Sequence, residues 1–249
     1  MIFRQLFEPL SSTYTYLLAC EQTGQAMLID PVVNCIDRDL ALLQQLGLTL
    51  DCTLDSHLHA DHITGALHLK QQTGCRIAAP AMDRLPCADI GLEDGRPLQL
   101  GSLHIMPLHT PGHTDSHFAF VHENRVFTGD ALLIDGCGRT DFQGGSAATL
   151  YRSVTEKLFA LPDEQLVYPG HDYQQRQVSS IGQEKARNAR LGGQRSLADF
   201  EALMAALDLP YPKFIDHALP GNRLCGVCPS DLPEQMQAYC TRMTHSPQG

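Results

Sequence analysis

Five histidines and two aspartates lie in four short, separate segments of this 249-residue chain. Neutral imidazole and carboxylate groups are the nitrogen and oxygen donors that zinc and iron take in proteins. A single histidine beside a turn usually has a surface or packing role, whereas closely spaced histidines and aspartates have little structural use together. The four segments therefore predict one buried metal site with these donors: His57, His59, Asp61, His62, His113, Asp130 and His171.

The first segment supplies four donors within six residues. His57 and His59 are two residues apart, so their side chains point to the same side of an extended chain. Asp61 and His62 follow where the chain is expected to turn into a helix, whose N-terminus stabilises a carboxylate. This many donors can serve two adjacent metal positions, so the motif leaves open whether one ion or two bind.

The three later segments each place one donor directly after a glycine. His113 and His171 both follow a Pro-Gly pair, whose turn fixes the backbone where a ligand must be aimed. Asp130 follows Gly129 at the end of a strand-like run, and its carboxylate could bind one ion or bridge two. The other histidines are expected in solvated or packing roles: His68, His104, His109, His117, His122, His217 and His245.

Apolar, strand-like runs precede the donor segments, and loops at strand ends are where rigid scaffolds place functional groups. β-Branched and aromatic residues predict strands over residues 13–20, 26–30, 50–55, 103–108, 117–121, 125–128 and 166–168. Apolar residues at helical spacing predict helices over residues 36–46, 62–72, 146–159, 183–191 and 196–207. The pattern predicts one α/β domain over residues 1–249, whose proline- and glycine-rich part from about residue 210 is an ordered, coil-rich extension.

The composition restricts the classes of function. A net charge of −10 disfavours nucleic acid as a partner, because nucleic-acid binders usually carry a basic face. No run approaches the roughly 18–20 apolar residues of a membrane span, and the first residues lack the layout of a secretory signal. We therefore expect a cytoplasmic location. The nine scattered cysteines are expected to be reduced thiols, with the role of Cys225 and Cys228, which form a Cys-x-x-Cys motif, left open.

The donor pattern resembles the metallo-β-lactamase superfamily, which implies an αββα four-layer sandwich with the metal at one edge of two packed sheets. The stretch from Gly129 to Gln143 resembles the persulfide dioxygenases, a group of sulfur dioxygenases that includes the ethylmalonic encephalopathy protein. Residues 57–65 and 215–226 are similar to the same group. Residues 136–139 also resemble glyoxalase II, but that family usually continues differently and has a longer helical C-terminal part.

This resemblance implies a single Fe(II) per chain, held by His57, His113 and Asp130. Two imidazoles and one carboxylate leave positions open for substrate and O₂. The remaining donors would be hydrogen-bonding groups around the iron: His59, Asp61, His62 and His171. The implied reaction oxidises glutathione persulfide with O₂ and water to sulfite and glutathione.

The resemblance also suggests four residues that bind the substrate. Arg139 could pair with a glutathione carboxylate and Tyr173 could donate its hydroxyl, while Arg223 and Cys225 lie in the similar C-terminal segment. Each has an ordinary alternative, such as a surface ion pair for Arg139 or a packing thiol for Cys225.

The donor pattern also allows two other interpretations, which are a dinuclear hydroxyacylglutathione hydrolase and a non-catalytic metal-binding partner. The family often forms homodimers, and any sulfurtransferase that acts with this chain would be a separate protein.

Overall fold

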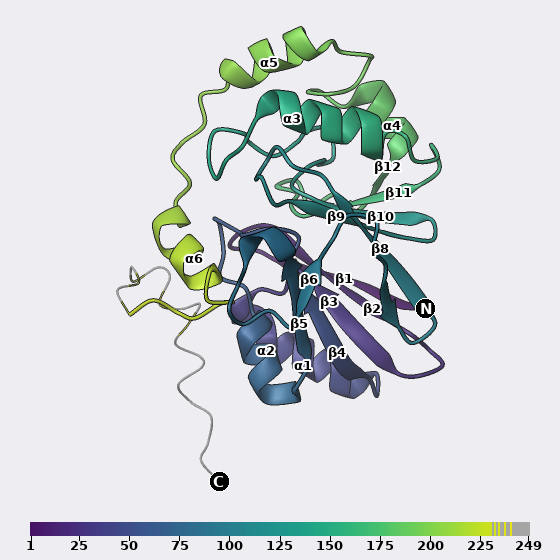
Figure 1. Cartoon of the computed structure of the whole chain (residues 1–249), viewed down its shortest axis with the longest axis vertical. Coiled ribbons are helices and arrows are strands. Elements are labelled where there is room, and N and C mark those ends of the chain that lie inside the picture. The colour runs from purple at the N-terminus through teal and green to yellow at the C-terminus, as the bar shows by residue number, and fades with distance from the viewer. Residues whose placement is uncertain (231, 233, 235–236, 238–239, 241–249) are drawn as a thin grey trace.

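The computed structural model of this chain describes residues 1–230, 232, 234, 237 and 240. Two six-stranded sheets pack face to face, and helices cover their outer faces, so the predicted αββα sandwich is confirmed (Figure 1). The extension predicted from about residue 210 continues past this part of the chain, and residues 241–249 lie outside the described residues.

The first sheet comes from the N-terminal half of the domain. Its strands, in spatial order, are β1 (Ile2–Glu8), β2 (Thr13–Ala19), β3 (Gln25–Ile29), β4 (Thr49–Leu54), β5 (Arg76–Pro80) and β6 (Ile90–Leu92). The strands from β3 to β6 run parallel, whereas β1, β2 and β3 pair antiparallel. All seven residues of β2 are buried, because this strand has covered faces on both sides.

The second sheet follows in the chain. Its spatial order is β12 (Ser179–Ser180), β11 (Leu166–Pro169), β10 (Arg125–Gly129), β9 (Phe118–His122), β8 (Leu103–His109) and β7 (Leu98–Leu100). Only β10 and β11 pair in parallel, while the other neighbours are antiparallel. Strands β8, β10 and β11 therefore run in the same direction and end at the same edge of the sheet.

The helices form the two outer layers and one edge. They are α1 (Ile36–Gln45), α2 (Ala66–Thr73), α3 (Ala147–Arg152), α4 (Ile181–Arg187), α5 (Leu197–Ala205) and α6 (Ile215–Asn222), with the shorter η1 (Val33–Cys35), η2 (Ala81–Asp83) and the π-helical η3 (Ser153–Leu158). In Figure 1, α1 and α2 lie against the first sheet and α3 and α4 against the second, whereas α6 lies beside the sandwich.

The space between the sheets is filled by aromatic side chains. Tyr16, Phe120 and Phe127 are fully buried, and the ring centroids of Tyr16 and Phe127 lie 4.9 Å apart. Burying a side chain of this size stabilises a fold by roughly 1.5–3 kcal/mol, so this layer is what holds the two sheets together. The Tyr16 hydroxyl also donates to the Pro169 carbonyl at 2.5 Å, which ties β2 of one sheet to the end of β11 in the other.

Two differences from the predicted secondary structure lie next to the donor segments. Helix α2 begins at Ala66 and not at His62, because the donor segment before it forms a turned loop. Residues 215–222 form helix α6 where an ordered coil was expected. Proline inside a helix costs about 3 kcal/mol, which made Pro220 a signal for coil. The packing of Ile215 and Ala218, both buried, overrides that cost.

The prediction that all cysteines are reduced is also wrong. Cys87 is bonded to Cys225, and Cys228 is bonded to Cys240. The fold brings the Cα atoms of these pairs to 6.2 and 6.1 Å, within disulfide range, although Cys87 and Cys225 are 138 residues apart. The two cysteines of the Cys-x-x-Cys motif therefore bond to different partners.

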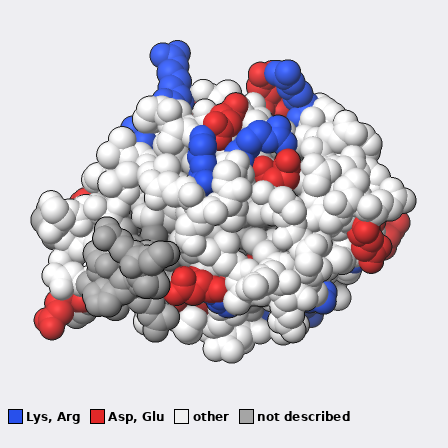
Figure 2. Space-filling model, turned by 90° about the horizontal axis from the view of Figure 1, so that it is seen from below, with Lys and Arg blue, Asp and Glu red and all other residues white. Residues whose placement is uncertain are grey.

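The surface agrees with the acidic composition. On the face seen from below in Figure 2, the described Lys and Arg side chains lie among acidic and uncharged residues and form no broad basic area. Among the described residues, no helix has both the length and the apolar character needed to cross a membrane.

Candidate metal centre

The four donor segments meet where strand ends of the two sheets face each other. The first follows β4, and the others follow β8, β10 and β11. Backbone hydrogen bonds join the two sheets here: the Tyr14 amide donates to the Gly170 carbonyl, and the Phe118 amide donates to the Ser56 carbonyl, both at 2.8 Å. The loops therefore have little freedom to separate, and the donors between them are preorganised.

Three of the predicted donors lie close together. His57, His113 and Asp130 each offer a ligand atom, and these atoms all lie within 4.8 Å of one another. The His113 Nε2 atom is 3.5 Å from Asp130 Oδ2. Asp130 Oδ1 is buried without a hydrogen-bond partner, which is costly for a carboxylate oxygen unless a cation or water compensates it. The group therefore fits a bound metal ion.

The hydrogen bonds around His57 determine which ring nitrogen is available to a metal. The Ser56 hydroxyl donates its only proton to Asp30 Oδ2 at 2.9 Å. The same hydroxyl lies 2.9 Å from His57 Nδ1, so it can only accept there, and Nδ1 must carry the proton. Nε2 of His57 is consequently the atom with the free lone pair.

A backbone carbonyl has the same effect on His113. Its Nδ1 lies 2.7 Å from the Arg139 carbonyl oxygen, which can only accept, so Nδ1 carries the proton and Nε2 is the donor atom. Gly112 allows this placement, since its φ is +133° and a side chain there would overlap the backbone of Leu150 in α3.

Asp130 is oriented by His117, a histidine for which the sequence predicts only a solvated or packing role. His117 is fully buried, and its Nε2 accepts from the Asp130 amide at 3.0 Å. Its Nδ1 therefore carries a proton and donates to Thr110 Oγ1 at 2.8 Å. On the other side, Gly170 approaches so closely that a Cβ atom there would lie 2.6 Å from Asp130 Oδ1.

The other predicted donors form a second group beside the first. His59, Asp61 and His62 also bring ligand atoms within 4.8 Å of one another. His62 Nδ1 lies 3.0 Å from Asp61 Oδ2, whereas His59 Nδ1 and His62 Nε2 are buried without a hydrogen-bond partner. His171 Nε2 lies between the groups, 3.4 Å from Asp61 Oδ2 and 3.6 Å from Asp130 Oδ1.

A buried ion pair connects the second group to β3. His59 Nε2 lies 3.2 Å from Asp30 Oδ1, and both side chains are almost completely buried. Burial alone would lower the pKa of His59, but the Asp30 carboxylate outweighs it and raises this pKa to about 9. Asp30 has a φ of 50° and also accepts from the Ser56 amide at 2.7 Å, so one carboxylate orients the start of the whole donor loop.

A pocket of about 560 Å³ opens above His113, Asp130 and His171. Arg139 and Tyr173, which the family resemblance suggests as substrate-binding residues, line it. Lys213, a residue that the sequence analysis missed, lines the same pocket.

Arg139 also holds the pocket wall in place. Its guanidinium forms two hydrogen bonds to Asp141, at 2.7 and 2.6 Å, and a third to the Pro210 carbonyl at 2.7 Å. These use three of its five N–H groups, so two remain for a ligand.

The two other predicted substrate-binding residues lie away from this pocket. Arg223 is exposed after the end of α6 and does not line the pocket wall. Cys225 is 1% exposed and packs in a small apolar cluster with Ala66 and Ile77, bonded to Cys87. The predicted placement of both residues against the substrate is therefore corrected, because α6 turns this segment away from the opening.

Sequence patterns missed the residues that orient the donors: Asp30, Ser56, His117 and Asn222. Asp30 carried a weak signal, as a carboxylate that ends an apolar strand before Pro31. The others carried none, because their partners lie elsewhere in the chain or in backbone groups that no side-chain pattern identifies.

The packed sheets and the histidine–aspartate centre at their strand ends are the features of the metallo-β-lactamase superfamily, whose sequence profile matches residues 9–171. Over 91% of the chain, the sequence is 44% identical to human persulfide dioxygenase ETHE1, mitochondrial, and covers 89% of that protein. A crystal structure of ETHE1 from Myxococcus xanthus superposes with a TM-score of 0.89 at 50% identity, covering 91% of this chain and 100% of that one. Hydroxyacylglutathione hydrolase from Rhodospirillum rubrum is 35% identical over 90% of this chain and 87% of its own length.

The chain belongs to the persulfide dioxygenase family of the metallo-β-lactamase superfamily. Membership of this family confirms the expectation that the chain is an oxidoreductase. The similarity also favours a sulfur dioxygenase over a glyoxalase II-type hydrolase.

Replacing Ser56 by alanine should weaken metal binding by about tenfold, because groups that orient a ligating imidazole typically contribute this much. Without the hydroxyl, His57 Nδ1 loses its partner and the ring can adopt the other tautomer. Competition with a chelator would measure the dissociation constant. Ser179→Ala is the matched control, since Ser179 is a buried serine that bonds to Glu184 away from the donors. Equal affinity for both variants would contradict the role of Ser56.

Mild acid should leave the metal in place. Burial, and then the neighbouring imidazoles of His59 and His113, hold the pKa of His57 well below its ordinary value. A lowered histidine pKa favours the neutral ring, which is the form that can bind a metal. We expect occupancy to persist at about pH 6 and to be lost below about pH 5, as measured by metal analysis after dialysis. Loss of the metal with a midpoint above the ordinary histidine pKa of about 6.5 would contradict a lowered pKa for His57.

Proposed function

We propose that this chain is a persulfide dioxygenase that oxidises glutathione persulfide with O₂ and water to sulfite and glutathione. We further propose that one Fe(II) per chain is the cofactor, held by His57, His113 and Asp130. The observation that supports this most strongly is the 44% identity with human persulfide dioxygenase over nearly the whole of both chains, together with three converging donors below an open pocket.

The hydrogen bonds favour the first donor group as the metal position. His57 and His113 both engage Nδ1 and leave Nε2 free, and Asp130 Oδ1 has no partner. In the second group, His59 uses Nε2 for Asp30, and Asp61 lies within hydrogen-bond distance of His62. A cation would therefore compensate the partnerless carboxylate oxygen of Asp130, whereas the Asp61 carboxylate of the second group already has His62 as a partner. The second group retains His59 Nδ1 and His62 Nε2 as buried ring nitrogens without a partner.

The donor chemistry fits a ferrous ion. Two imidazoles and one carboxylate form the ligand set of non-haem iron oxygenases, and iron when bound there would supply the redox chemistry with O₂ that zinc lacks. The residues of the chain would bind the ion, direct the persulfide end of the substrate towards it and hold the tripeptide in the pocket. Fixing the reacting groups in this way contributes to the rate because less entropy is lost at the transition state.

The pocket wall has the groups to recognise glutathione, which carries two carboxylates. We propose that Arg139 pairs with one of them through its two remaining N–H groups. Lys213, an exposed cation on the same wall, is suited to the other. Tyr173 lies almost parallel to the His171 ring, with the centroids 6.2 Å apart, and could donate its hydroxyl to the substrate.

A dinuclear hydroxyacylglutathione hydrolase is the second candidate. The second donor group, with His171 between the two groups, is the observation that favours it. The hydrolase from Rhodospirillum rubrum is 35% identical to this chain, whereas human persulfide dioxygenase is 44% identical. The first candidate therefore has the stronger support.

We also propose that the chain forms a homodimer in the cytosol and receives its persulfide from a separate sulfurtransferase. Human and bovine members are named as mitochondrial proteins, and a dimer would be tested by light scattering of the purified chain.

Purified protein should contain one iron per chain and take up O₂ only when glutathione persulfide is added. Metal analysis and an oxygen electrode would measure both quantities. Asp130→Ala should lose iron and oxygen uptake together, because Asp130 is the only carboxylate in the first donor group. Two ions per chain with thioester hydrolysis and no oxygen uptake would instead support the hydrolase.

Arg139→Ala should raise KM for glutathione persulfide by about tenfold with a smaller effect on kcat, because a carboxylate contact acts on bound and activated substrate alike. The variant also breaks the pair with Asp141, so Asp141→Ala is the matched control. Removing Asp141 should leave KM unchanged or lower it, since the guanidinium is then freer to meet the substrate. A similar rise of KM in both variants would mean that Arg139 only supports the wall.

A further inference from the structure

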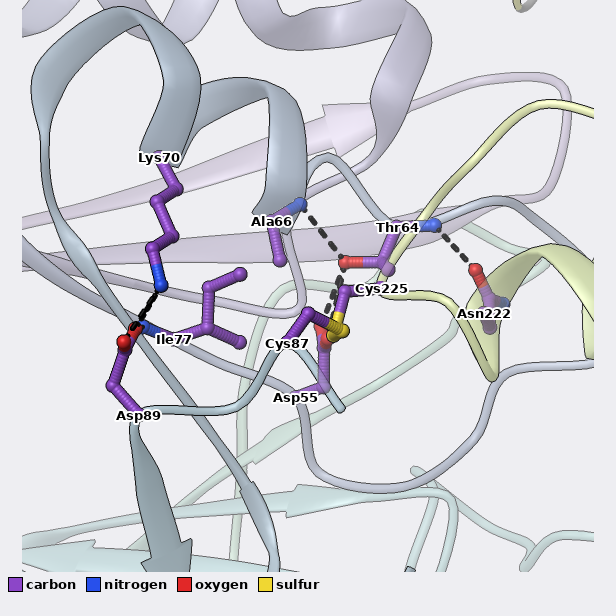
Figure 3. The surroundings of a disulfide bond; sticks show 9 residues. All are labelled: Asp55, Thr64, Ala66, Lys70, Ile77, Cys87, Asp89, Asn222 and Cys225. Carbon is purple, nitrogen blue, oxygen red and sulfur yellow. Dashed lines mark hydrogen bonds and ion pairs between the residues drawn. A yellow bond between two sulfur atoms is a disulfide. The ribbon is translucent and has the colours of Figure 1, made fainter. Parts of the chain in front are cut away.

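The side chain of Asn222, at the C-terminal end of α6, binds the backbone of the donor loop. Its Nδ2 donates to the His59 and His62 carbonyls, both at 2.8 Å. Its Oδ1 accepts from the Thr64 amide at 2.9 Å (Figure 3). The residue is 2% exposed, so water does not compete for these bonds. One side chain from the far end of the chain therefore fixes both ends of the segment from His59 to Thr64.

The Cys87–Cys225 disulfide holds the end of α6 against this loop. Cys225 lies three residues after Asn222, and its carbonyl accepts from the Leu67 amide in α2 at 3.0 Å. Gly226 packs so tightly on Thr64 that a side chain there would overlap the Thr64 carbonyl. Figure 3 shows the disulfide next to Thr64 and Ala66, with Asn222 on the other side of Thr64.

The other half of the disulfide is anchored to the first sheet. Cys87 lies in the loop between η2 and β6, and Asp89 in that loop accepts from the Ile77 amide of β5 at 2.8 Å. Lys70 of α2 also pairs with Asp89, at 2.6 Å. The disulfide thus connects α6 to a rigid part of the fold, so that Asn222 cannot move away from the loop while the bond is intact.

We propose that Asn222 is a positioning residue for the metal centre, and that the Cys87–Cys225 disulfide keeps it in place, so that reduction of this bond weakens metal binding. The inference rests on the donor group His57, His113 and Asp130 but not on the persulfide reaction. A low-molecular-weight thiol would be the reductant. One thiolate attacks the half-buried Cys87 sulfur and releases the Cys225 thiolate, and a second thiolate then releases Cys87, with two thiols oxidised to one disulfide.

The role of Asn222 is tested by metal affinity, with Fe(II) added anaerobically and measured by competition with a chelator. Asn222→Ala should bind Fe(II) about tenfold more weakly, as expected when a group that supports a metal site is lost. Gln165→Ala is the matched control, since Gln165 is a buried amide that donates to the Glu123 carbonyl away from the site. Both variants should lower the melting temperature of the metal-free protein, but only Asn222→Ala should lose affinity.

A second variant separates the hydrogen bonds from the volume of the side chain. Asn222→Asp keeps the shape and the acceptor for the Thr64 amide but cannot donate to the two histidine carbonyls. Its affinity should fall as far as that of Asn222→Ala. Wild-type affinity in either folded variant would overturn the positioning role, whatever reaction the enzyme catalyses.

The redox link is tested on the wild-type chain, which also covers the case in which the Asn222 variants fail to fold. Oxidised protein should bind Fe(II) several-fold more tightly than protein that has been reduced and then freed of reductant. Cys87→Ser should match the reduced protein and no longer respond to reductant. Cys228→Ser breaks the other disulfide and should keep the wild-type response. Equal affinity of oxidised and reduced wild type, or a response that follows Cys228 instead of Cys87, would overturn the link.

Discussion

The centre depends on one buried carboxylate. Asp30 is almost inaccessible to water, and its charge is compensated by the Ser56 amide, the Ser56 hydroxyl and the His59 ring. An uncompensated charge at this depth would be very unfavourable, so these groups cannot move away independently. The same contacts select the tautomer of His57. The compensation of the buried Asp30 charge therefore fixes the conformation of the histidine-rich loop and the orientation of its donors.

The two sheets make this arrangement possible because they bring the ends of distant strands together. Each donor stands just beyond a strand whose own position is fixed by pairing and by the aromatic layer between the sheets. Glycines occur where the loops must touch, as at Gly112 against α3 and Gly170 against Asp130. The core thus contributes to function indirectly, because it sets the distance between loops that have no regular structure of their own.

The αββα sandwich was implied by the family resemblance, whereas the donors could be predicted from the sequence for a physical reason. Donors need particular residue types at close spacing, and His57, His59, Asp61 and His62 satisfy that requirement within one loop. Asp30, His117 and Asn222 act through hydrogen bonds to partners that are distant in the sequence, so no local pattern identifies them. The same limit applies to Cys87 and Cys225, whose bond depends on the position of α6, and the sequence signals of Pro220 and Gly221 pointed away from a helix there.

Helix α6 connects the pocket above the donors to the donor loop. Its first residue, Ile215, lines the pocket, and its last, Asn222, binds the His59 and His62 carbonyls. The segment before it is held by a hydrogen bond from the Arg139 guanidinium to the Pro210 carbonyl. The backbone carbonyl of Arg139 in turn accepts a hydrogen bond from His113 Nδ1. The pocket wall and the loop that presents the donors therefore share the same supports. A change in the wall that shifts α6 must also strain the donor loop beneath it.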